Sequence, residues 1–237
     1  MTLRLASLLC LAATVTLAAA GDAAPPASVK ASYDVYRNGL HIVTTEETFE
    51  QNGAEYRIAS ESNPVGLFAL FVRTRARVTS NGAITPAGLR PAQFEYGRLD
   101  DPSKSVSATF DWNADLLRMS FDGRNETAAI AAGAQDGLSV MYQFMFLHSD
   151  NLRDLAFQMS RNGRKIENYH YQLADREELA TGIGKLDTLH LVKKREGNEN
   201  EVEIWLAPER NLFPVKLLIT ENDGTKFEQI ITHLEFK

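Results

Sequence analysis

Stretches in which apolar and polar residues alternate one by one recur along the chain from Ser32 onward. Successive side chains of a strand point to opposite faces, so alternation predicts a strand with one buried and one solvated face. Charged residues such as Arg153, Glu203 and Lys216 occupy many of the alternate positions. The pattern indicates an antiparallel sheet with one wet and one dry face. The apolar members of the clearest stretches are Val106, Ala108, Phe110 and Trp112; Leu117, Met119 and Phe121; Leu155, Phe157 and Met159; Val202, Ile204 and Leu206; and Val215, Leu217 and Ile219.

Five dipeptides suited to tight turns separate these stretches. They supply the positive φ angles that two-residue hairpin turns require, so the sequence predicts a meander of hairpins. The dipeptides are Asn38-Gly39, Asn52-Gly53, Asn81-Gly82, Asn162-Gly163 and Asp223-Gly224.

The segment 135–148, QDGLSVMYQFMFLH, departs from alternation because its apolar residues are too dense. Leu138, Met141, Tyr142 and Met145 follow helical spacing, and further apolar residues fill the other faces. Asp136 is suited to the N-cap, and Ser139 is placed to help close the first turn. We expect a short helix that is apolar nearly all round and therefore buried.

These elements predict an all-β, mainly antiparallel fold of roughly a dozen strands. Strand twist accumulates across an open sheet, so we expect a curled open or half barrel. One apolar helix would pack in the concave side and leave an apolar groove between helix and sheet. No linker follows the first thirty residues, so residues 31–237 are expected to form a single β-barrel-like domain.

The first thirty residues read as a targeting segment and a lead-in. Residues 1–20 carry Arg4, an apolar run and three closing alanines, the pattern of a cleavable secretory signal peptide. Residues 21–30 form a flexible lead-in. Cys10, the single cysteine, lies inside the apolar run, so cleavage leaves no disulfide. The run is too short to span a bilayer, and we expect no transmembrane span. The signal alone allows either periplasmic or secreted destinations.

The net charge of the chain argues against nucleic-acid binding. Lys and Arg number 25 against 31 Asp and Glu, a net charge of −6 that becomes −7 when Arg4 leaves with the signal. A mildly acidic chain lacks the basic footprint of nucleic-acid binding, so we expect no nucleic-acid partner.

Three segments together resemble the family of exported bacterial proteins known as domain of unknown function 3108. They are YDVYRNGLHIV from residue 33, QDGLSVMYQFMFL from residue 135 and WLAPERNLFPVKLLITENDG from residue 205. Val43 and Gly137 depart from the family's usual residues. The resemblance implies a periplasmic setting and a β-rich fold without an established activity. The last hairpin is also similar to that of periplasmic lipoprotein carriers, which are open barrels lidded by helices.

Five residues are our ligand-binding candidates. Arg73, Arg75 and Arg77 share one face of an expected strand and could bind phosphate or carboxylate groups. The alternative is a cross-strand ladder with Glu46, Glu50 or Glu61, which is the commoner arrangement in antiparallel sheets. Tyr142 and Trp205 are aromatic residues that could line a cavity, although ordinary core packing accounts for such residues too.

The hairpin 201–224 places Trp205 on the face opposite Val202, Ile204 and Leu206. Trp205 therefore either covers the outer face of the sheet or belongs to a contact surface. Val215, Leu217 and Ile219 are expected to face the core together. Pro208 and Pro214 are expected to stop the strands from pairing further around the loop.

Catalytic and metal-binding signatures are weak. The five histidines show no ligand spacing, so no metal or other cofactor is expected. Ser139 lacks a nucleophile elbow, and TGIGK at 181–185 is an incomplete phosphate loop. Adjacent carboxylates such as Glu46 and Glu47 point to opposite faces of a strand and cannot act as a catalytic pair.

Three functions follow from this reading. The first is a non-enzymatic protein of the cell envelope that binds an apolar ligand, or the acyl part of a lipid or lipoprotein, in the half-barrel groove. The second is a structural or adaptor protein that docks on another envelope component through an edge strand or the arginine face. The third is an enzyme that acts on polysaccharide.

Overall fold

A computed structural model describes residues 24–237 of the chain except 72–74, 99–100, 194–196 and 198. Within these residues, fifteen strands form one continuous sheet. The first half contributes β1 (Ser28–Arg37), β2 (Leu40–Asn52), β3 (Glu55–Pro64), β4 (Ala76–Thr85), β5 (Gly88–Arg98), β6 (Asp101–Asp111), β7 (Leu116–Phe121) and β8 (Arg124–Ala129). The second half contributes β9 (Gln135–Asp136), β10 (Asp154–Ser160), β11 (Glu167–Thr181), β12 (Gly184–Lys193), β13 (Glu201–Ala207), β14 (Phe213–Thr220) and β15 (Lys226–Phe236).

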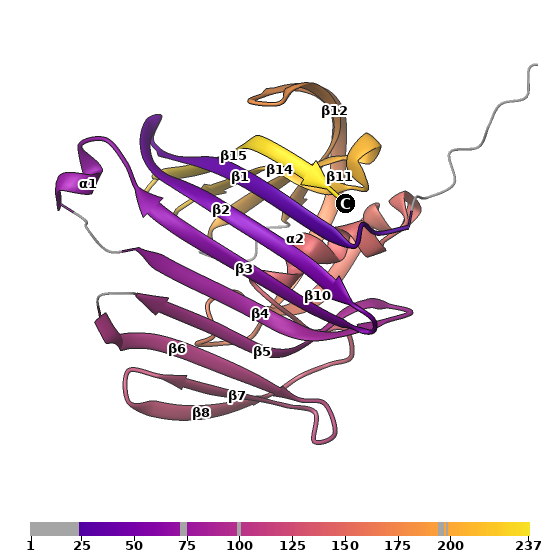
Figure 1. The fold of residues 1–237 in the computed structure, drawn as a ribbon. Helices are drawn as coiled ribbons and strands as arrows, with labels where there is room; N and C mark the ends of the chain where they lie inside the picture. The colour runs from indigo at the N-terminus through magenta and orange to yellow at the C-terminus, as the bar shows by residue number, and fades with distance from the viewer. Residues whose placement is uncertain (1–23, 72–74, 99–100, 194–196, 198) are drawn as a thin grey trace, which may run out of the picture.

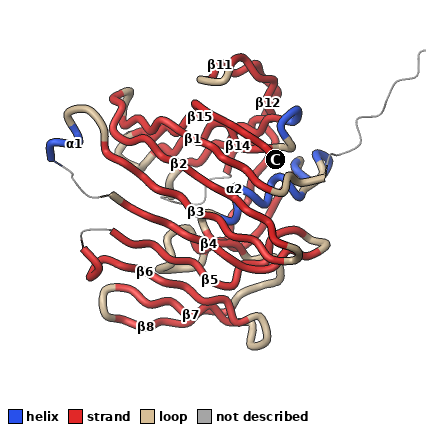
Figure 2. Tube along the Cα trace, viewed as in Figure 1, coloured by secondary structure: helices blue, strands red, loops and turns tan. Residues whose placement is uncertain are grey.

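Helical segments in the described residues are short. They are α1 (Phe68–Phe71), α2 (Ser139–Gln143) and the 3-10 turns η1 (Phe144–Phe146), η2 (Ser149–Leu152) and η3 (Pro208–Arg210). Figure 2 shows how strands dominate the chain trace. None of the described helices has the length and apolar character that crossing a bilayer would require.

The sheet runs from β8 back to β1, then from β15 back to β9. Most neighbours in the chain pair as antiparallel hairpins, but β8 and β9 form the two opposite edges of the sheet. The β1–β15 pair joins the two ends of the chain in the middle of the sheet. The short β9 pairs with β10 in parallel. The sheet curls around α2, which lies on its concave side (Figure 1). The prediction of an open, curled sheet plugged by a helix is confirmed.

The strand number exceeds the expected dozen because some strands carry no alternation. In β8, all residues except one are exposed, so the strand presents no apolar face that a pattern could reveal. The two residues of β9 are too few to form a pattern, and both are buried. Periodicity therefore detects only strands that bury one face and expose the other.

The segment expected as one helix consists of the two-residue strand β9, a turn, the single turn of α2 and the 3-10 turn η1 in succession. Its side chains divide between two clusters of buried apolar residues. Leu138, Tyr142 and Met145 join a cluster built mainly from the first half of the sheet. Val140 and Phe144 join a second cluster with the apolar face of β10 to β13. The segment is buried on several sides, as its composition predicts.

Three of the five turn dipeptides lie wholly in turns or loops between strands, and Asn52-Gly53 begins at the last residue of β2 and enters the turn. The fifth does not form a turn. Asn81-Gly82 lies inside β4, at a register shift opposite β5. A Cβ on Gly82 would lie 2.2 Å from the carbonyl oxygen of Arg90, so glycine permits a close approach of two backbones. The expected hairpin turn at this position is wrong, and the dipeptide marks a bulge instead.

A second bulge corrects the expected faces of β14. Trp205 pairs with Lys216 and Leu206 pairs with Pro214, so Val215 has no partner on β13. Val215 consequently points into the first cluster, whereas Leu217 and Ile219 pack against the second. Pro214 is part of the β13–β14 ladder and does not end it.

Candidate functional site

A cavity of about 410 Å³ lies on the concave side between the sheet and the segments that enter α2 and leave β10. Its apolar walls come from β4, β5 and β6 and from the residue before α2. The loop after β10 supplies charged and polar residues. The lining comprises Ser60, Val78, Phe94, Tyr96, Val106, Gly137, Leu138, Arg161, Asn162 and Arg164.

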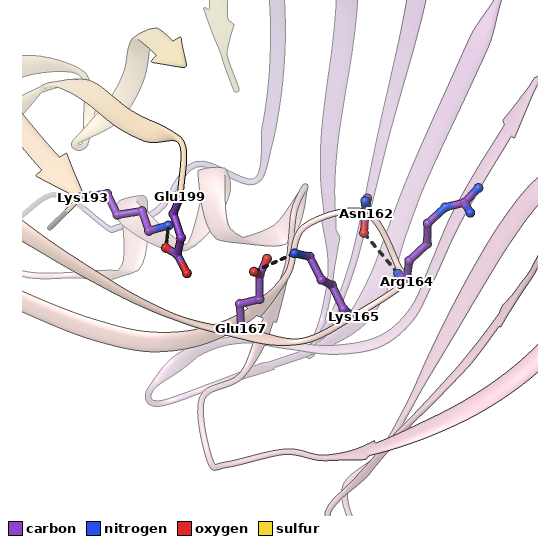
Figure 3. Close-up of polar contacts among 6 residues, drawn as sticks. All are labelled: Asn162, Arg164, Lys165, Glu167, Lys193 and Glu199. Carbon is purple, nitrogen blue, oxygen red and sulfur yellow. Dashed lines mark hydrogen bonds and ion pairs between the residues drawn. The ribbon is translucent and has the colours of Figure 1, made fainter. Parts of the chain in front are cut away.

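The loop between β10 and β11 closes this cavity. A Cβ on Gly163 would approach Val106 and Phe94 to within about 3 Å, so the loop backbone lies directly against β5 and β6. Arg164 pairs with Asp122 at the end of β7 and lies 5.3 Å from the ring of Phe121. Its side chain extends from the loop toward the strands in Figure 3.

Basic side chains line this loop and the neighbouring strand. Lys165 pairs with Glu167 at 2.8 Å, and Lys193 pairs with Glu199 while lying 4.7 Å from the ring of Tyr169 (Figure 3). Arg161 is exposed, and its side chain makes no ion pair with any residue that the structure describes. Of these basic residues, Arg161 and Arg164 line the cavity, so its apolar interior has two arginines at the rim, one of which is paired with Asp122.

A buried carboxylate lies behind the cavity wall. Glu47 on β2 is 8% exposed and accepts hydrogen bonds from Ser60 Oγ and from the Tyr142 hydroxyl, both at 3.1 Å. Burial raises the pKa of Glu47 to about 6, although the two hydrogen bonds favour the charged form. Ser60 therefore lies between the two: it lines the cavity, and its hydroxyl donates to the Glu47 carboxylate behind the wall.

A second polar network fixes the start of α2. Asp136 accepts hydrogen bonds from the backbone N–H groups of Leu138 at 2.9 Å and Ser139 at 2.7 Å. It also accepts the Ser80 hydroxyl at 2.6 Å, and Ser80 contacts the Tyr56 hydroxyl at 3.1 Å. Desolvation raises the pKa of Asp136, and these hydrogen bonds oppose the rise. Asp136 therefore binds two N–H groups at the start of the helix, but the expected N-cap assignment is wrong, because Leu138 occupies the N-cap position and Asp136 lies two residues before it.

The two open depressions on the convex face differ from this cavity. The first, about 560 Å³, is lined by outward-facing polar side chains such as Arg57, Arg77 and Glu95. The second, about 660 Å³, lies near Trp112 and Arg118. An apolar ligand needs apolar walls, so the smaller cavity on the concave side suits such a ligand better than either larger depression.

The structure does not gather the five ligand-binding candidates into one place. Arg73 lies outside the described residues. Arg75 is exposed just before β4, and Arg77 pairs with Glu61 at 3.4 Å across the convex face. That pair is the cross-strand alternative that the sequence left open, with Glu61 directly opposite Arg77 in the register.

The two aromatic candidates lie apart as well. Tyr142 is fully buried, bonds Glu47, and reaches the cavity only through Ser60. Trp205 is only 5% exposed because three side chains cover it. The His190 ring stacks on it with the ring centroids 4.3 Å apart, and the Lys216 ammonium lies 4.6 Å from the ring centroid. The Glu177 carboxylate accepts the indole N–H. Neither residue is among those lining the cavity.

The structure also shows what Ser139 and the TGIGK segment do. The Ser139 hydroxyl accepts the backbone N–H of Asp136 at 3.0 Å, a turn contact. Thr181 closes the TGIGK turn by donating to the Gly184 carbonyl at 2.7 Å. Over the part of the chain that the structure covers, no group of three or more His, Cys, Asp or Glu residues could hold a metal ion.

Glu47 and Ser60 were missed as site residues, yet a signal for Glu47 exists. Thr45, Glu47 and Phe49 alternate along β2, so Glu47 occupies the face that Phe49 buries. Reading Glu46 and Glu47 only as a failed catalytic pair overlooks that one of two neighbours on a strand must point inward. Arg161 had no such signal, because it follows β10 in a loop whose path depends on tertiary contacts.

One solved structure shares the fold at low sequence identity, and two others show a weaker similarity. A beta-barrel-like protein of domain of unknown function DUF1849 from Brucella abortus matches with a TM-score of 0.57 and 10% identity, over 91% of this chain and 100% of that one. A candidate lipoprotein from Parabacteroides distasonis has a TM-score of 0.39 and 9% identity, over 90% and 96% of the two chains. A candidate exported protein with a YmcC-like fold from Bacteroides fragilis has a TM-score of 0.38 and 10% identity, over 89% and 96%.

The first of these similarities supports the fold and says nothing of function, because the identity is so low. Comparison with curated proteins gives no match. The family model described as "Protein of unknown function (DUF3108)" matches residues 32–231, which is nearly the whole described sheet. The chain therefore belongs to the DUF3108 family.

Proposed function

We propose that this protein binds the acyl chain of a lipid or lipoprotein in the cavity on the concave side, as a non-enzymatic component of the cell envelope. The observation that carries the proposal is the cavity of about 410 Å³ with walls of Val78, Phe94, Tyr96, Val106 and Leu138. Ligand pockets of about 300–1,000 Å³ with mostly apolar walls and a few polar groups are typical of small-molecule sites.

The rim supports an amphiphilic ligand with an anionic head. Arg161 is exposed and without an ion pair in the described residues, so its guanidinium is available to a phosphate or carboxylate. Arg164, by contrast, is held by Asp122 and serves to keep the loop against the sheet. An acyl chain would lie against the apolar walls while its head remained at the solvent-facing loop.

The buried polar groups favour binding over catalysis. Glu47 and Asp136 are each held by hydrogen bonds, and neither is among the residues that line the cavity. A general acid or base must reach its substrate within hydrogen-bond distance, directly or through one water molecule. The signal peptide expected at residues 1–20 supports an envelope location and, together with the family, favours the periplasm.

A cavity-filling substitution tests the proposal. Val78→Phe would project a ring into the cavity, and Thr79→Phe, on the convex face of the same strand, is the matched control. We expect Val78→Phe to weaken binding of a fluorescent fatty acid at least about tenfold and Thr79→Phe to leave it unchanged. Mass spectrometry of protein purified from its own envelope should also find co-extracted lipid.

Two results would overturn the proposal. One is purified protein that carries no lipid and does not bind the fatty acid at all. The other is equal binding by the wild type and by a folded Val78→Phe protein, since the ligand would then lie elsewhere.

A further inference from the structure

Three exposed leucines gather at one end of the sheet. Leu67 and Leu70, before and within α1, are 73% and 67% exposed, and Leu40 at the start of β2 is 60% exposed. These are the large hydrophobic side chains that stay exposed in the described part of the chain. In Figure 1, α1 projects beyond the strand ends, close to the turn between β1 and β2. We call Leu40, Leu67 and Leu70 the leucine tip.

Backbone contacts hold the leucine tip in place. The N–H of Val65 donates to the carbonyl of Ile42 at 2.9 Å, which ties the segment before α1 to β2. Within the tip, the N–H of Leu70 donates to the carbonyl of Leu67 at 3.1 Å. Phe68, the half-buried residue between them, faces a cavity of about 230 Å³ together with Tyr96. The fold covers part of Phe68 and leaves the two leucines outside, so their exposure is a feature of a defined structure.

Cations lie at the same end of the sheet as the leucine tip. Arg75 is exposed where the chain enters β4, and Lys226 is exposed beside the β1–β2 turn, where its backbone bonds Asn38. Neither side chain makes an ion pair with a residue that the structure describes. Arg37, next to Leu40 in the β1–β2 ladder, lies over the ring of Phe227 at 5.8 Å. This end of the protein therefore presents apolar side chains beside the cations Arg75 and Lys226, together with the Asp34 carboxylate, which lies 3.2 Å from His41.

We propose that the leucine tip docks this protein on the surface of an anionic lipid bilayer. Apolar side chains exposed together mark a contact surface, and each gains free energy when it leaves water for the acyl region. Lys and Arg side chains beside them are attracted to anionic headgroups within about a Debye length. The leucines suit the acyl region of such a bilayer, and the cations suit its anionic headgroups.

The position of the tip links it to the cavity described above, although the inference does not depend on ligand binding. Tyr96 lines both the small cavity beneath α1 and the larger cavity on the concave side. A bilayer in contact with the leucine tip would thus lie near the small cavity, which shares the Tyr96 side chain with the larger one.

Vesicle flotation of the full mature protein tests the proposal. We expect the wild type to float with vesicles of phosphatidylethanolamine and phosphatidylglycerol, and the double variant Leu67→Ser, Leu70→Ser to partition at least about tenfold less. Arg75→Glu should weaken binding to these vesicles, whereas Arg124→Glu, on the exposed edge strand β8, is the matched control and should bind like the wild type. Because both leucines are exposed, the double variant should keep the unfolding midpoint of the wild type.

Three outcomes would overturn the proposal. They are a wild type that does not float with these vesicles, a folded double variant that floats as well as the wild type, and equal losses from Arg75→Glu and Arg124→Glu. A tip that instead captures one envelope protein in crosslinking, with no vesicle binding, would assign the surface to a protein partner.

Discussion

Glu47 shows how a single inward-facing carboxylate can make stability depend on pH. Its usual pKa of 4.5 rises to about 6 in the fold, mainly because burial disfavours the charged form. Between these values the folded protein binds more protons than the unfolded chain. Stability therefore falls as pH rises through this window, and the full cost is present above about pH 6. A rise of this size corresponds to roughly 2 kcal/mol.

Glu47→Gln should remove that dependence, because glutamine has no charge to bury. Its carbonyl oxygen can accept one of the two hydroxyl groups that Glu47 binds, and its amide N–H can donate to the hydroxyl oxygen of the other. We expect the free energy of unfolding of the variant, relative to the wild type, to increase by roughly 2 kcal/mol from about pH 4.5 to pH 7. Urea unfolding at the two pH values measures this difference, and titrations shared by both proteins cancel.

Glu46→Gln is the control for this measurement, because Glu46 is exposed on the convex face of the same strand. Its difference from the wild type should stay constant with pH. The buried position of Glu47 is wrongly assigned if the wild type and Glu47→Gln show parallel pH dependence.

A close contact between two backbone segments explains why glycine stands at position 137, where the family commonly has a larger residue. A Cβ at this position would lie 2.1 Å from the carbonyl oxygen of Arg161, so the chain entering α2 touches the chain leaving β10. The backbone of Gly137 does not have a positive φ, hence space alone and not conformation requires glycine. Both residues line the cavity, so this contact also shapes its wall.

Gly137→Ala should therefore destabilise the protein, because two backbone segments would have to separate. Forcing a methyl group into a filled position costs about 1–3 kcal/mol. Gly97→Ala is the matched control, since its Cβ would meet nothing closer than the Ser105 hydroxyl at 3.8 Å. There alanine should be neutral or slightly stabilising. Thermal unfolding of the two variants measures the contrast, and equal midpoints would disprove the contact between Gly137 and Arg161.

Strands with one buried face could be predicted from the sequence, whereas interruptions of the ladder could not. Leu117 and Met119 alternate with polar residues and are buried as expected. The bulges at Gly82 and Val215 depend on which residues of the partner strand lie opposite, and a single strand carries no record of that register. A groove between helix and sheet was expected, but the residues that line the cavity could not be predicted for the same reason, since Val78, Leu138 and Arg161 come together only after the sheet has curled.

The two halves of the sheet meet at β1 and β15, so each half lacks a complete core by itself. Residues from both halves share the first apolar cluster: Tyr33 and Phe49 from one, Val215 and Phe213 from the other. The Tyr33 hydroxyl donates to the Pro214 carbonyl at 3.0 Å, and the Tyr142 ring lies 5.6 Å from that of Phe213. Separating the halves would expose this cluster and the unpaired edges of β1 and β15.

The single domain expected over residues 31–237 can be tested with the two tryptophans, which lie in different halves. Trp112, at the end of β6, donates its indole N–H to the Pro91 carbonyl at 2.6 Å, and Trp205 lies on β13. In Trp112→Phe the remaining tryptophan reports on the second half, and in Trp205→Phe the remaining tryptophan reports on the first.

Each variant loses an indole hydrogen bond, and its free energy of unfolding should fall by about 1 kcal/mol, so the two transitions are compared within each variant. Because β1–β15 pairing and the shared cluster couple the halves, fluorescence and far-UV circular dichroism should give one coincident urea transition in each variant. A fluorescence transition that separates from the circular dichroism in either variant would show that the halves unfold independently, in spite of the continuous sheet.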